Sequence, residues 1–168
     1  MTVIKVNRPH DQGLIQEVPL MDAQALENVL SKAHRLFLNT EHWLPAYERI
    51  EILERTAQLM TEQIEKLTKI AAQEGGKPYQ DSKVEVLRAV NGVKLAIEYI
   101  AHIKGEQIPM GHTRSSAQRL AYTMREPIGV VASVSAFNHP LNLTVHQTVP
   151  AIAVGSPVII KPAKATPL

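Results

Sequence analysis

The sequence predicts an α/β protein in which an N-terminal hairpin and three helices pack on the start of a parallel sheet. Two observations predict this fold. The first hundred residues alternate turn-forming breaks with amphipathic helical patterns. Further on, the apolar, β-branched runs 128–137 and 156–162 are typical of strands buried on both faces, and a helical segment separates them. Strand, helix and strand within about 35 residues make a βαβ unit, and such units build parallel sheets.

The N-terminal region combines a short hairpin with helices. Strand-like runs at 3–6 and 14–18 flank the turn-forming residues RPHDQG, which predicts the hairpin. Asp22 is a typical helix N-cap, and the pair Gly75-Gly76 is a typical helix stop. Together with apolar residues at helical spacing, these signals predict three helices, the second about 30 residues long: 22–39, 45–75 and 78–105.

The sequence changes character after Gly105. Residues 106–118 are expected to form a loop, and 119–125 an exposed or edge strand. The helix of the βαβ unit is predicted over 141–155, where Pro150 should kink it or delay its start. Two parallel strands leave open sheet edges, so we expect further strands from elsewhere to complete the sheet. The chain therefore divides into an N-terminal layer, a bridging strand and the βαβ unit: 1–118, 119–126 and 127–168.

Composition excludes several classes of function. The 168 residues carry 18 basic and 16 acidic side chains, a net charge of +2 that gives no reason to expect nucleic acid or a charged membrane surface as a partner. No cysteine is present, so disulfides, zinc thiolates and a cysteine nucleophile are excluded within this sequence. The histidines lack a metal-binding spacing such as HExxH. Without a signal-like N-terminus or a long apolar run, we expect a cytoplasmic protein with no membrane span.

Two polar residues stand where the strands of the βαβ unit end. Asn138, in the sequence FNHP, can aim its amide N–H at a developing oxyanion, or it can be a turn or N-cap residue. Lys161 can reach ribose hydroxyls or phosphate oxygens, or it can be a solvated charge at a strand end. Because parallel strands end at one edge, the pair predicts a dinucleotide crevice there. The glycine fingerprint GxGxxG does not follow the first strand, so a pyrophosphate would be held by other means.

Longer segments resemble the aldehyde dehydrogenase superfamily. REPIGVVASVSAFNHPLNL and VPAIAVGSPVIIKPAKATPL are similar to its P-x-G-V-V segment, then W/F-N-x-P, an apolar helix ending in glycine, and a strand ending in K-P-x-x-x-T-P. Upstream, WLPAYERIEIL, EGGKP and VEV resemble further family segments. The likeness covers nearly the whole chain, in order and at the expected spacing. It implies an incomplete aldehyde dehydrogenase fold with a Rossmann-like sheet.

The resemblance implies roles for residues at the shared sheet edge. Asn138 would supply the oxyanion-hole amide, and Lys161 would hydrogen-bond the adenosine ribose of NAD(P). Many NAD-preferring members have glutamate where this sequence has Lys164. A lysine cannot accept bonds from the ribose hydroxyls and would attract a 2′-phosphate, so NAD and NADP both stay open as the cofactor. Three residues, the last of which is often tryptophan in the family, would line the cofactor cleft largely through backbone: Ser135, Ala136 and Phe137.

The sequence around Asn138 resembles a subgroup that oxidises small anionic or hydroxylated aldehydes, including phosphonoacetaldehyde and lactaldehyde dehydrogenases. In the phosphonoacetaldehyde type, a histidine after the oxyanion asparagine and an arginine on the third helix help to bind the phosphonate. His139 and Arg88 fall at these places. The guanidinium fork of Arg88 matches phosphonate or carboxylate oxygens. The alternative is that Arg88 is a solvated helix charge and His139 a turn residue.

The resemblance as a whole implies the N-terminal part of an enzyme that oxidises an aldehyde to its carboxylic acid with NAD or NADP. The family's cysteine nucleophile and general-base glutamate have no counterpart here, so the 168-residue chain alone is expected to be inactive. Full-length relatives are dimers or tetramers, and the hairpin and the 119–125 strand resemble elements that pair between subunits. Two alternatives stay open: a short non-catalytic binding or regulatory relative that pairs with a full-length subunit, and a different α/β nucleotide-binding protein that uses only the βαβ unit.

Overall fold

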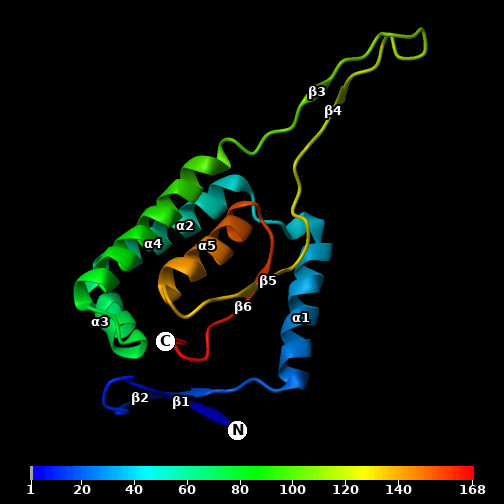
Figure 1. Cartoon of the computed structure of the whole chain (residues 1–168). Coiled ribbons are helices and arrows are strands. Elements are labelled where there is room, and N and C mark those ends of the chain that lie inside the picture. The colour runs from blue at the N-terminus through cyan, green and yellow to red at the C-terminus, as the bar shows by residue number, and fades with distance from the viewer. Residues whose placement is uncertain (1) are drawn as a thin grey trace.

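The computed structural model describes residues 2–168, which form a helical body, a small parallel sheet and a long projecting arm (Figure 1). A single 3₁₀ turn, Thr40–His42, joins the first two helices. No helix within this range combines the length and the apolar character that a bilayer crossing requires. The elements follow one another in this order: β1 Val3–Asn7, β2 Leu14–Pro19, α1 Ala23–Leu38, α2 Ala46–Glu62, α3 Ile64–Gly75, α4 Tyr79–Ile100, β3 Gln107–Ile108, β4 Ala121–Tyr122, β5 Val131–Val134, α5 Pro140–Ala153 and β6 Val158–Lys161.

The local signals of the N-terminal region are confirmed. β1 and β2 pair antiparallel, with Val3 opposite Pro19. Asp22 caps α1, because its Oδ1 accepts a hydrogen bond of 2.8 Å from the Ala25 N–H. Gly76 has a φ of 64° and ends α3 in the left-handed conformation that glycine adopts without steric cost.

The single long helix predicted over 45–75 is wrong, so residues 2–100 hold four α-helices and not three. Gln63 leaves the helical conformation, with φ −109° and ψ 14°, and separates α2 from α3. Both helices pack against α4, which has 22 residues and is therefore about 33 Å long. A straight helix of 30 residues would be about 45 Å long and would overrun it. Apolar spacing stays helical on both sides of Gln63, so the sequence pattern did not reveal the break.

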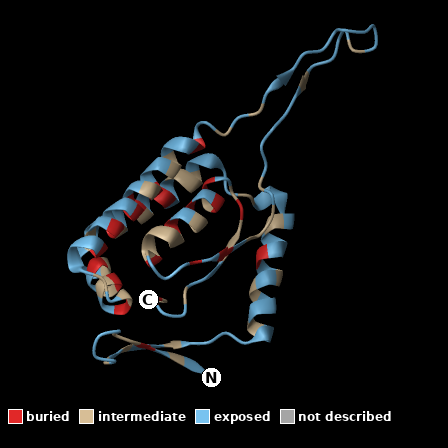
Figure 2. Cartoon of the chain, viewed as in Figure 1, coloured by how far each residue is buried: buried red, intermediate tan, exposed pale blue. Residues whose placement is uncertain are grey.

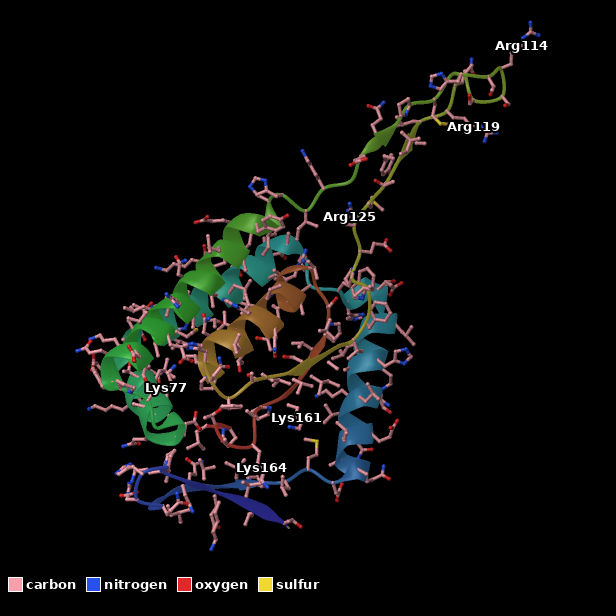
Figure 3. All side chains as sticks on the ribbon, in the orientation of Figure 1. Lys77, Arg114, Arg119, Arg125, Lys161 and Lys164 are labelled. Atoms are coloured by element: carbon pink, nitrogen blue, oxygen red, sulfur yellow. The ribbon has the colours of Figure 1, made fainter. Side chains whose placement is uncertain are left out.

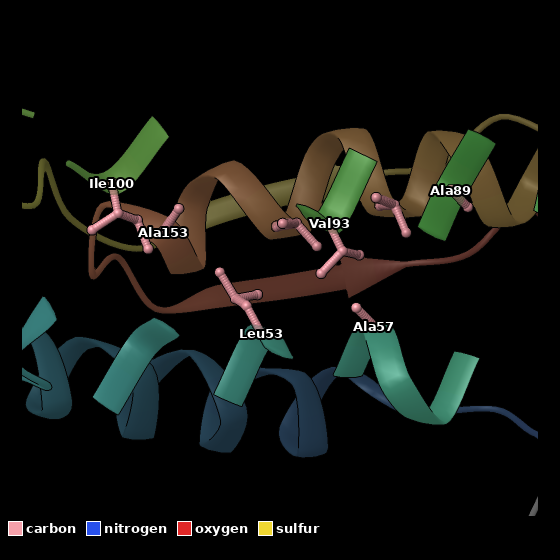
Figure 4. Packing of buried hydrophobic residues seen from close by; sticks show 8 residues of the cluster. Leu53, Ala57, Ala89, Val93, Ile100 and Ala153 are labelled. Atoms are coloured by element: carbon pink, nitrogen blue, oxygen red, sulfur yellow. The ribbon is translucent and has the colours of Figure 1, made fainter. Parts of the chain in front are cut away.

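The core lies where α2, α4 and α5 meet (Figure 4). Small residues allow α4 and α5 to come close, and a Cβ built on Gly92 would lie 3.2 Å from a methyl carbon of Val145. The packing holds α5 along its length and so fixes where its N-terminal end lies. The buried members of this cluster come from all three helices: Leu53, Ala57, Ala89, Val93, Ile100, Val145, Val149 and Ala153.

The arm that follows α4 is a thin two-stranded ribbon that projects from the body (Figures 1 and 2). β3 and β4 pair antiparallel over two residues each, with Gln107 opposite Tyr122. The predicted strand 119–125 is therefore reduced to Ala121–Tyr122, and part of the predicted loop 106–118 pairs with it. Within residues 2–168, no third strand or layer packs against the ribbon. Because an isolated two-stranded ribbon is only marginally stable, few of its residues pair.

The βαβ unit forms as predicted, although its strands are short. β5 and β6 pair in parallel from Val131 opposite Val158 to Val134 opposite Lys161. α5 packs on one face of this pair, and α1 contacts β6. Pro140 occupies the first turn of α5, so the helix starts before the predicted residue 141 and Pro150 does not delay it.

The prediction that both strands are buried on both faces is wrong for residues 2–168. Ser133 is the buried residue of β5, whereas Val134 is 63% exposed and Ile160 of β6 is 40% exposed. Burial on two faces needs a layer on each side and strands on each edge, and this sheet has two strands. The apolar runs therefore predicted the strands and their pairing but not their environment.

Candidate functional site

The carboxyl ends of β5 and β6 lie side by side and form the edge on which the candidate residues gather. Val134 is paired with Lys161, and the Ser135 N–H donates to the Lys161 carbonyl over 3.0 Å. The segment from Ala136 to Asn138 continues directly from this pairing. The structure therefore brings Asn138 and Lys161 to the same edge of the sheet, one crossover apart in the chain.

The two faces of this edge differ in character. The hydroxyl of Ser133 donates to Gln147 Oε1 at 2.8 Å, and the hydroxyl of Thr144 donates to that of Ser135 at 3.2 Å. Both serines therefore point at α5. Because side chains alternate along a strand, Val134 and its partner Lys161 point to the other face. The hydroxyl of Ser135 is thus used inside the domain, which leaves a backbone role as the one open to it at a cofactor cleft.

The positive charges at the edge come from two lysines. Lys161 is the last residue of β6 and is exposed, with its ammonium 3.4 Å from the Pro162 carbonyl. Lys164 is also exposed and lies in the turn closed by the bridge between Ala163 and Thr166. Figure 3 shows both lysines below the sheet, between the end of β6 and the β1–β2 hairpin. Two mobile ammonium groups at this place can donate to hydroxyl or phosphate oxygens.

Asn138 and His139 connect the end of β5 to the start of α5. His139, and not Asn138, occupies the N-cap position of α5, and its side chain makes no capping hydrogen bond. The side chain of Asn138 is exposed, while its carbonyl accepts a hydrogen bond of 3.1 Å from Lys77 Nζ. The N-cap alternative for Asn138 is therefore not what the structure contains. Its amide is available at the surface of the sheet edge. Phe137, next to it, is also exposed.

The N-terminus of α5 is capped by a buried carboxylate from another helix. Glu85 of α4 has a fully buried side chain, and its Oε1 accepts from the Leu141 N–H at 3.0 Å and the Asn142 N–H at 3.4 Å. Its Oε2 pairs with Lys77 Nζ at 2.6 Å. A negative charge at this end of a helix meets unpaired N–H groups and the positive end of the helix dipole. Glu85 therefore stabilises the first turn of α5.

The far end of α5 is held by a positive group. The guanidinium of Arg49, from α2, donates to the Ala153 carbonyl in the last turn of α5. Burial lowers the pKa of the Arg49 side chain from its usual value. The carboxylate of Glu85 lies at the N-terminal end of α5 and the guanidinium of Arg49 at its C-terminal end. Each charge interacts favourably with the helix dipole.

Sequence reasoning assigned no role to Lys77 or Glu85, although both lie in family-like segments. A signal was present, since Glu85 lies between Ser82 and Val86 on a face of α4 that is otherwise small or apolar and buried. A charged residue on such a face is almost never buried without a partner. What the sequence could not supply is the partner, because Lys77 precedes the helix and the α5 N–H groups lie more than 50 residues away.

Arg88 lies about one turn along α4 from Glu85, and its side chain is exposed. It makes no side-chain hydrogen bond or ion pair with the residues from 2 to 168. His139, in contrast, is engaged: its Nδ1 lies 3.0 Å from Lys77 Nζ and 3.3 Å from Glu85 Oε2. The substrate-binding roles predicted for Arg88 and His139 remain predictions. The described part of the chain holds no group of three or more His, Cys, Asp or Glu residues arranged to bind a metal ion.

A second buried carboxylate, Glu74 of α3, makes a pH-dependent contribution to stability. Burial raises the pKa of the Glu74 carboxyl to about 7, and the hydrogen bond from the Leu168 N–H, 2.9 Å long, partly opposes this shift. The folded state then binds a proton more tightly than the unfolded chain, where the pKa is near 4.5. Between these two values the contribution of this group falls as pH rises, by up to about 1.4 kcal/mol per pH unit.

Replacing Glu74 with glutamine is therefore expected to stabilise the protein more at pH 8 than at pH 5. Glutamine keeps an acceptor for the Leu168 N–H and carries no charge at either pH. The measurement is the difference in thermal midpoint between wild type and Glu74→Gln at the two pH values. A Glu65→Gln control, at an exposed carboxylate, should show no such gain at pH 8. Equal differences at both pH values for Glu74→Gln would contradict a raised pKa.

The fold and the site define an α/β domain with a polar, positively charged edge of the kind that holds nucleotides. Comparison with known proteins narrows this class. The pattern of the aldehyde dehydrogenase family matches residues 1–168, and the chain belongs to this family. It is 39% identical over 165 residues to a 3-sulfolactaldehyde dehydrogenase of Priestia megaterium, and 34% identical over 163 residues to a lactaldehyde dehydrogenase of Methanocaldococcus jannaschii. These alignments cover 98% and 97% of the chain and 34% of each relative.

Solved structures agree with this assignment. Aldehyde dehydrogenase 21 of Physcomitrella patens, in complex with the product succinate, superposes with a TM-score of 0.92 at 30% identity, over 99% of this chain and 34% of that one. The second structure is a glyceraldehyde-3-phosphate dehydrogenase of Methanocaldococcus jannaschii complexed with NADP. It superposes with a TM-score of 0.88 at 33% identity, over 98% of this chain and 34% of that one. The chain thus spans about a third of the length of the proteins it matches.

Proposed function

We propose that this chain is the N-terminal part of an aldehyde dehydrogenase that uses NAD or NADP to oxidise a small anionic or hydroxylated aldehyde to its carboxylic acid. The observation that carries the proposal is the shared sheet edge, where Asn138 and Lys161 lie one crossover apart within a fold of this family. Asn138 contributes an amide donor beside the aldehyde. Lys161 contributes an ammonium donor to the cofactor.

The chemistry of the groups present determines which catalytic roles we assign to this chain. An amide N–H held near the reacting carbonyl stabilises the negative charge that develops on its oxygen. The nicotinamide cofactor, when bound, accepts the hydride. The 168 residues contain no thiol, and we place the nucleophile and the general base in the remaining length of the enzyme. An assay of the 168-residue chain with aldehyde and NAD(P) should accordingly show no reduction of cofactor, and turnover by this chain would contradict that placement.

The substrate class rests on His139 and Arg88. Two relatives bear the names 3-sulfolactaldehyde dehydrogenase and lactaldehyde dehydrogenase. The aldehydes in these names are small and carry a hydroxyl or an anionic group. An imidazole N–H and an exposed guanidinium are donors suited to the oxygens of such groups. We place both side chains around the substrate's far end, away from the reacting carbonyl.

Cofactor binding provides the test. Lys161→Met is expected to weaken both NAD and NADP about 10- to 100-fold, because it removes a charge-assisted hydrogen bond. Lys164→Glu should weaken NADP by a similar factor and leave NAD unchanged or tighter, because a carboxylate repels a 2′-phosphate and accepts from ribose hydroxyls. Isothermal titration of the whole enzyme with each cofactor measures both effects. A Lys94→Glu control changes another exposed lysine, on α4. Unchanged affinities in Lys161→Met would contradict the proposed cofactor site.

The arm supports a further part of the proposal, a homodimer or homotetramer of the whole protein. Its side chains include exposed apolar groups, with Leu120 74% and Met124 68% exposed. Apolar side chains gathered on a projecting ribbon are typical of surfaces that pair with another chain. Analytical ultracentrifugation of the whole protein measures its oligomeric state. A monomer would contradict the proposed dimer or tetramer. We also propose that the whole protein is cytoplasmic, where a catalytic thiol elsewhere in the enzyme would stay reduced.

A second candidate function is a short relative without catalysis that pairs with a full-length subunit. The open edges of the two-stranded sheet favour it, since an unpaired strand edge can accept a strand from another chain. Size-exclusion chromatography with and without a full-length partner separates the two. Stable, stoichiometric association of the 168-residue chain with such a subunit would favour the second candidate.

A further inference from the structure

We propose that Lys77, held by Glu85, is a positioning residue that fixes the backbone of Asn138 and the ring of His139 in the orientation the reaction needs. The inference rests on the proposed function, because it gives Lys77 a role through Asn138. Lys77 lies in the segment between α3 and α4, far along the chain from the two residues it holds. Figure 3 shows it at that junction.

The hydrogen bonds of Lys77 match its three donors. A lysine ammonium carries three N–H groups and no acceptor. Lys77 Nζ lies 2.6 Å from Glu85 Oε2, 3.1 Å from the Asn138 carbonyl and 3.0 Å from His139 Nδ1. Its side chain is 18% exposed, so water contributes little. Each donor thus has one protein acceptor, and two of the three acceptors belong to the dipeptide that precedes α5.

This arrangement favours one tautomer of His139. Its Nδ1 lies closer to Lys77 Nζ, at 3.0 Å, than to Glu85 Oε2, at 3.3 Å. Because an ammonium cannot accept, the shorter of these two contacts is one in which Lys77 donates and Nδ1 accepts. In the neutral ring the proton then resides on Nε2. The side chain of His139 is 45% exposed. Lys77 therefore favours a His139 ring that presents its Nε2–H as a donor to an oxygen of the substrate.

The same network holds the segment from Asn138 to Asn142 at both of its ends. Lys77 fixes the Asn138 carbonyl, while Glu85 fixes the N–H groups of Leu141 and Asn142 three and four residues later. Both oxygens of Glu85 have partners as well: Oε1 accepts from the first turn of α5, and Oε2 lies against Lys77 Nζ and His139 Nδ1. A side-chain amide on a backbone held in this way loses little orientational freedom when it meets a developing charge.

A double-mutant cycle in the whole enzyme tests this role. Lys77→Met is expected to lower kcat about 10- to 100-fold, with little change in KM for the cofactor, because a misplaced donor costs rate rather than cofactor binding. In the Asn138→Ala background the same substitution should lower kcat less than about 3-fold, since the group it positions is gone. Lys83→Met, which removes a lysine from a surface ion pair with Glu65, is the matched control and should leave kcat unchanged.

Hydrogen exchange gives a readout that does not depend on activity. Peptides covering residues 138–143 should exchange faster in Lys77→Met and not in Lys83→Met, while the rest of α5 keeps its protection. Where Lys77→Met does not fold, Lys77→Arg replaces it, because a planar guanidinium keeps the charge but cannot converge on three acceptors.

The outcomes distinguish the oxyanion role of Asn138 from the positioning role of Lys77. If Asn138→Ala leaves kcat unchanged, the oxyanion role in the proposed function is wrong. If Asn138→Ala lowers kcat and Lys77→Met multiplies that loss in full, Lys77 acts independently of Asn138 and the positioning role is overturned. Unchanged kcat and unchanged exchange in a folded Lys77→Met also overturn it.

Discussion

Replacing Asn138 with alanine is expected to lower kcat of the whole enzyme about 100- to 1000-fold, with a much smaller change in KM for the aldehyde. Asn138 is exposed at the sheet edge and its backbone carbonyl accepts a hydrogen bond from Lys77, so the backbone that carries the amide is held before substrate arrives. A donor that binds the oxyanion more strongly than the ground-state carbonyl affects the transition state selectively. Steady-state kinetics with saturating cofactor measure the effect.

The control for this prediction is Asn138→Asp. Aspartate is close to asparagine in shape and suits turns and helix starts equally well, but it has no N–H to donate. If Asn138 is an oxyanion donor, Asn138→Asp should lose at least as much activity as Asn138→Ala, since it also brings a negative charge to the developing anion. Near-normal activity in Asn138→Asp would instead restore the interpretation of Asn138 as a turn residue.

Local signals predicted much of the fold because they act over a few residues. The Asp22 cap and the left-handed Gly76 each follow from the chemistry of one side chain or its absence. The parallel pairing of β5 with β6 follows from the order strand, helix, strand. The break at Gln63 could not be predicted in this way. α2 and α3 both pack against α4, which is shorter than a single helix over 45–75 would be, and this tertiary contact is not visible in the residues around Gln63.

In the candidate site, too, some features could be predicted from the sequence and others could not. The common edge for Asn138 and Lys161 was predictable, because parallel strands point their carboxyl ends in one direction. The exposure of Val134 was not, because an apolar strand residue is buried only where another layer covers it. Nor was the contact of Lys77 with Asn138, which joins residues 61 positions apart. A family-like segment can indicate that such residues matter, but only the packing of α4 on α5 shows what they touch.

Replacing Glu85 with alanine is expected to lower the free energy of unfolding by about 3–5 kcal/mol. The substitution leaves the ammonium of Lys77 mostly buried without its carboxylate and removes the acceptor for the Leu141 and Asn142 N–H groups. Breaking a buried pair costs more than the pair contributes, because the remaining charge stays desolvated. Urea unfolding followed by circular dichroism should show a lower midpoint.

Two further variants separate the causes of this loss. Glu85→Gln keeps an oxygen for the α5 N–H groups but carries no charge, so its loss should lie between wild type and Glu85→Ala. Lys77→Met in the Glu85→Ala background should recover part of the loss, because it removes the charge that was left unpaired. Glu65→Ala breaks a solvent-exposed pair with Lys83 and should cost no more than about 1 kcal/mol. If Glu85→Ala cost no more than Glu65→Ala, the carboxylate would not be holding the start of α5, and Asn138 would owe its place to the helix packing alone.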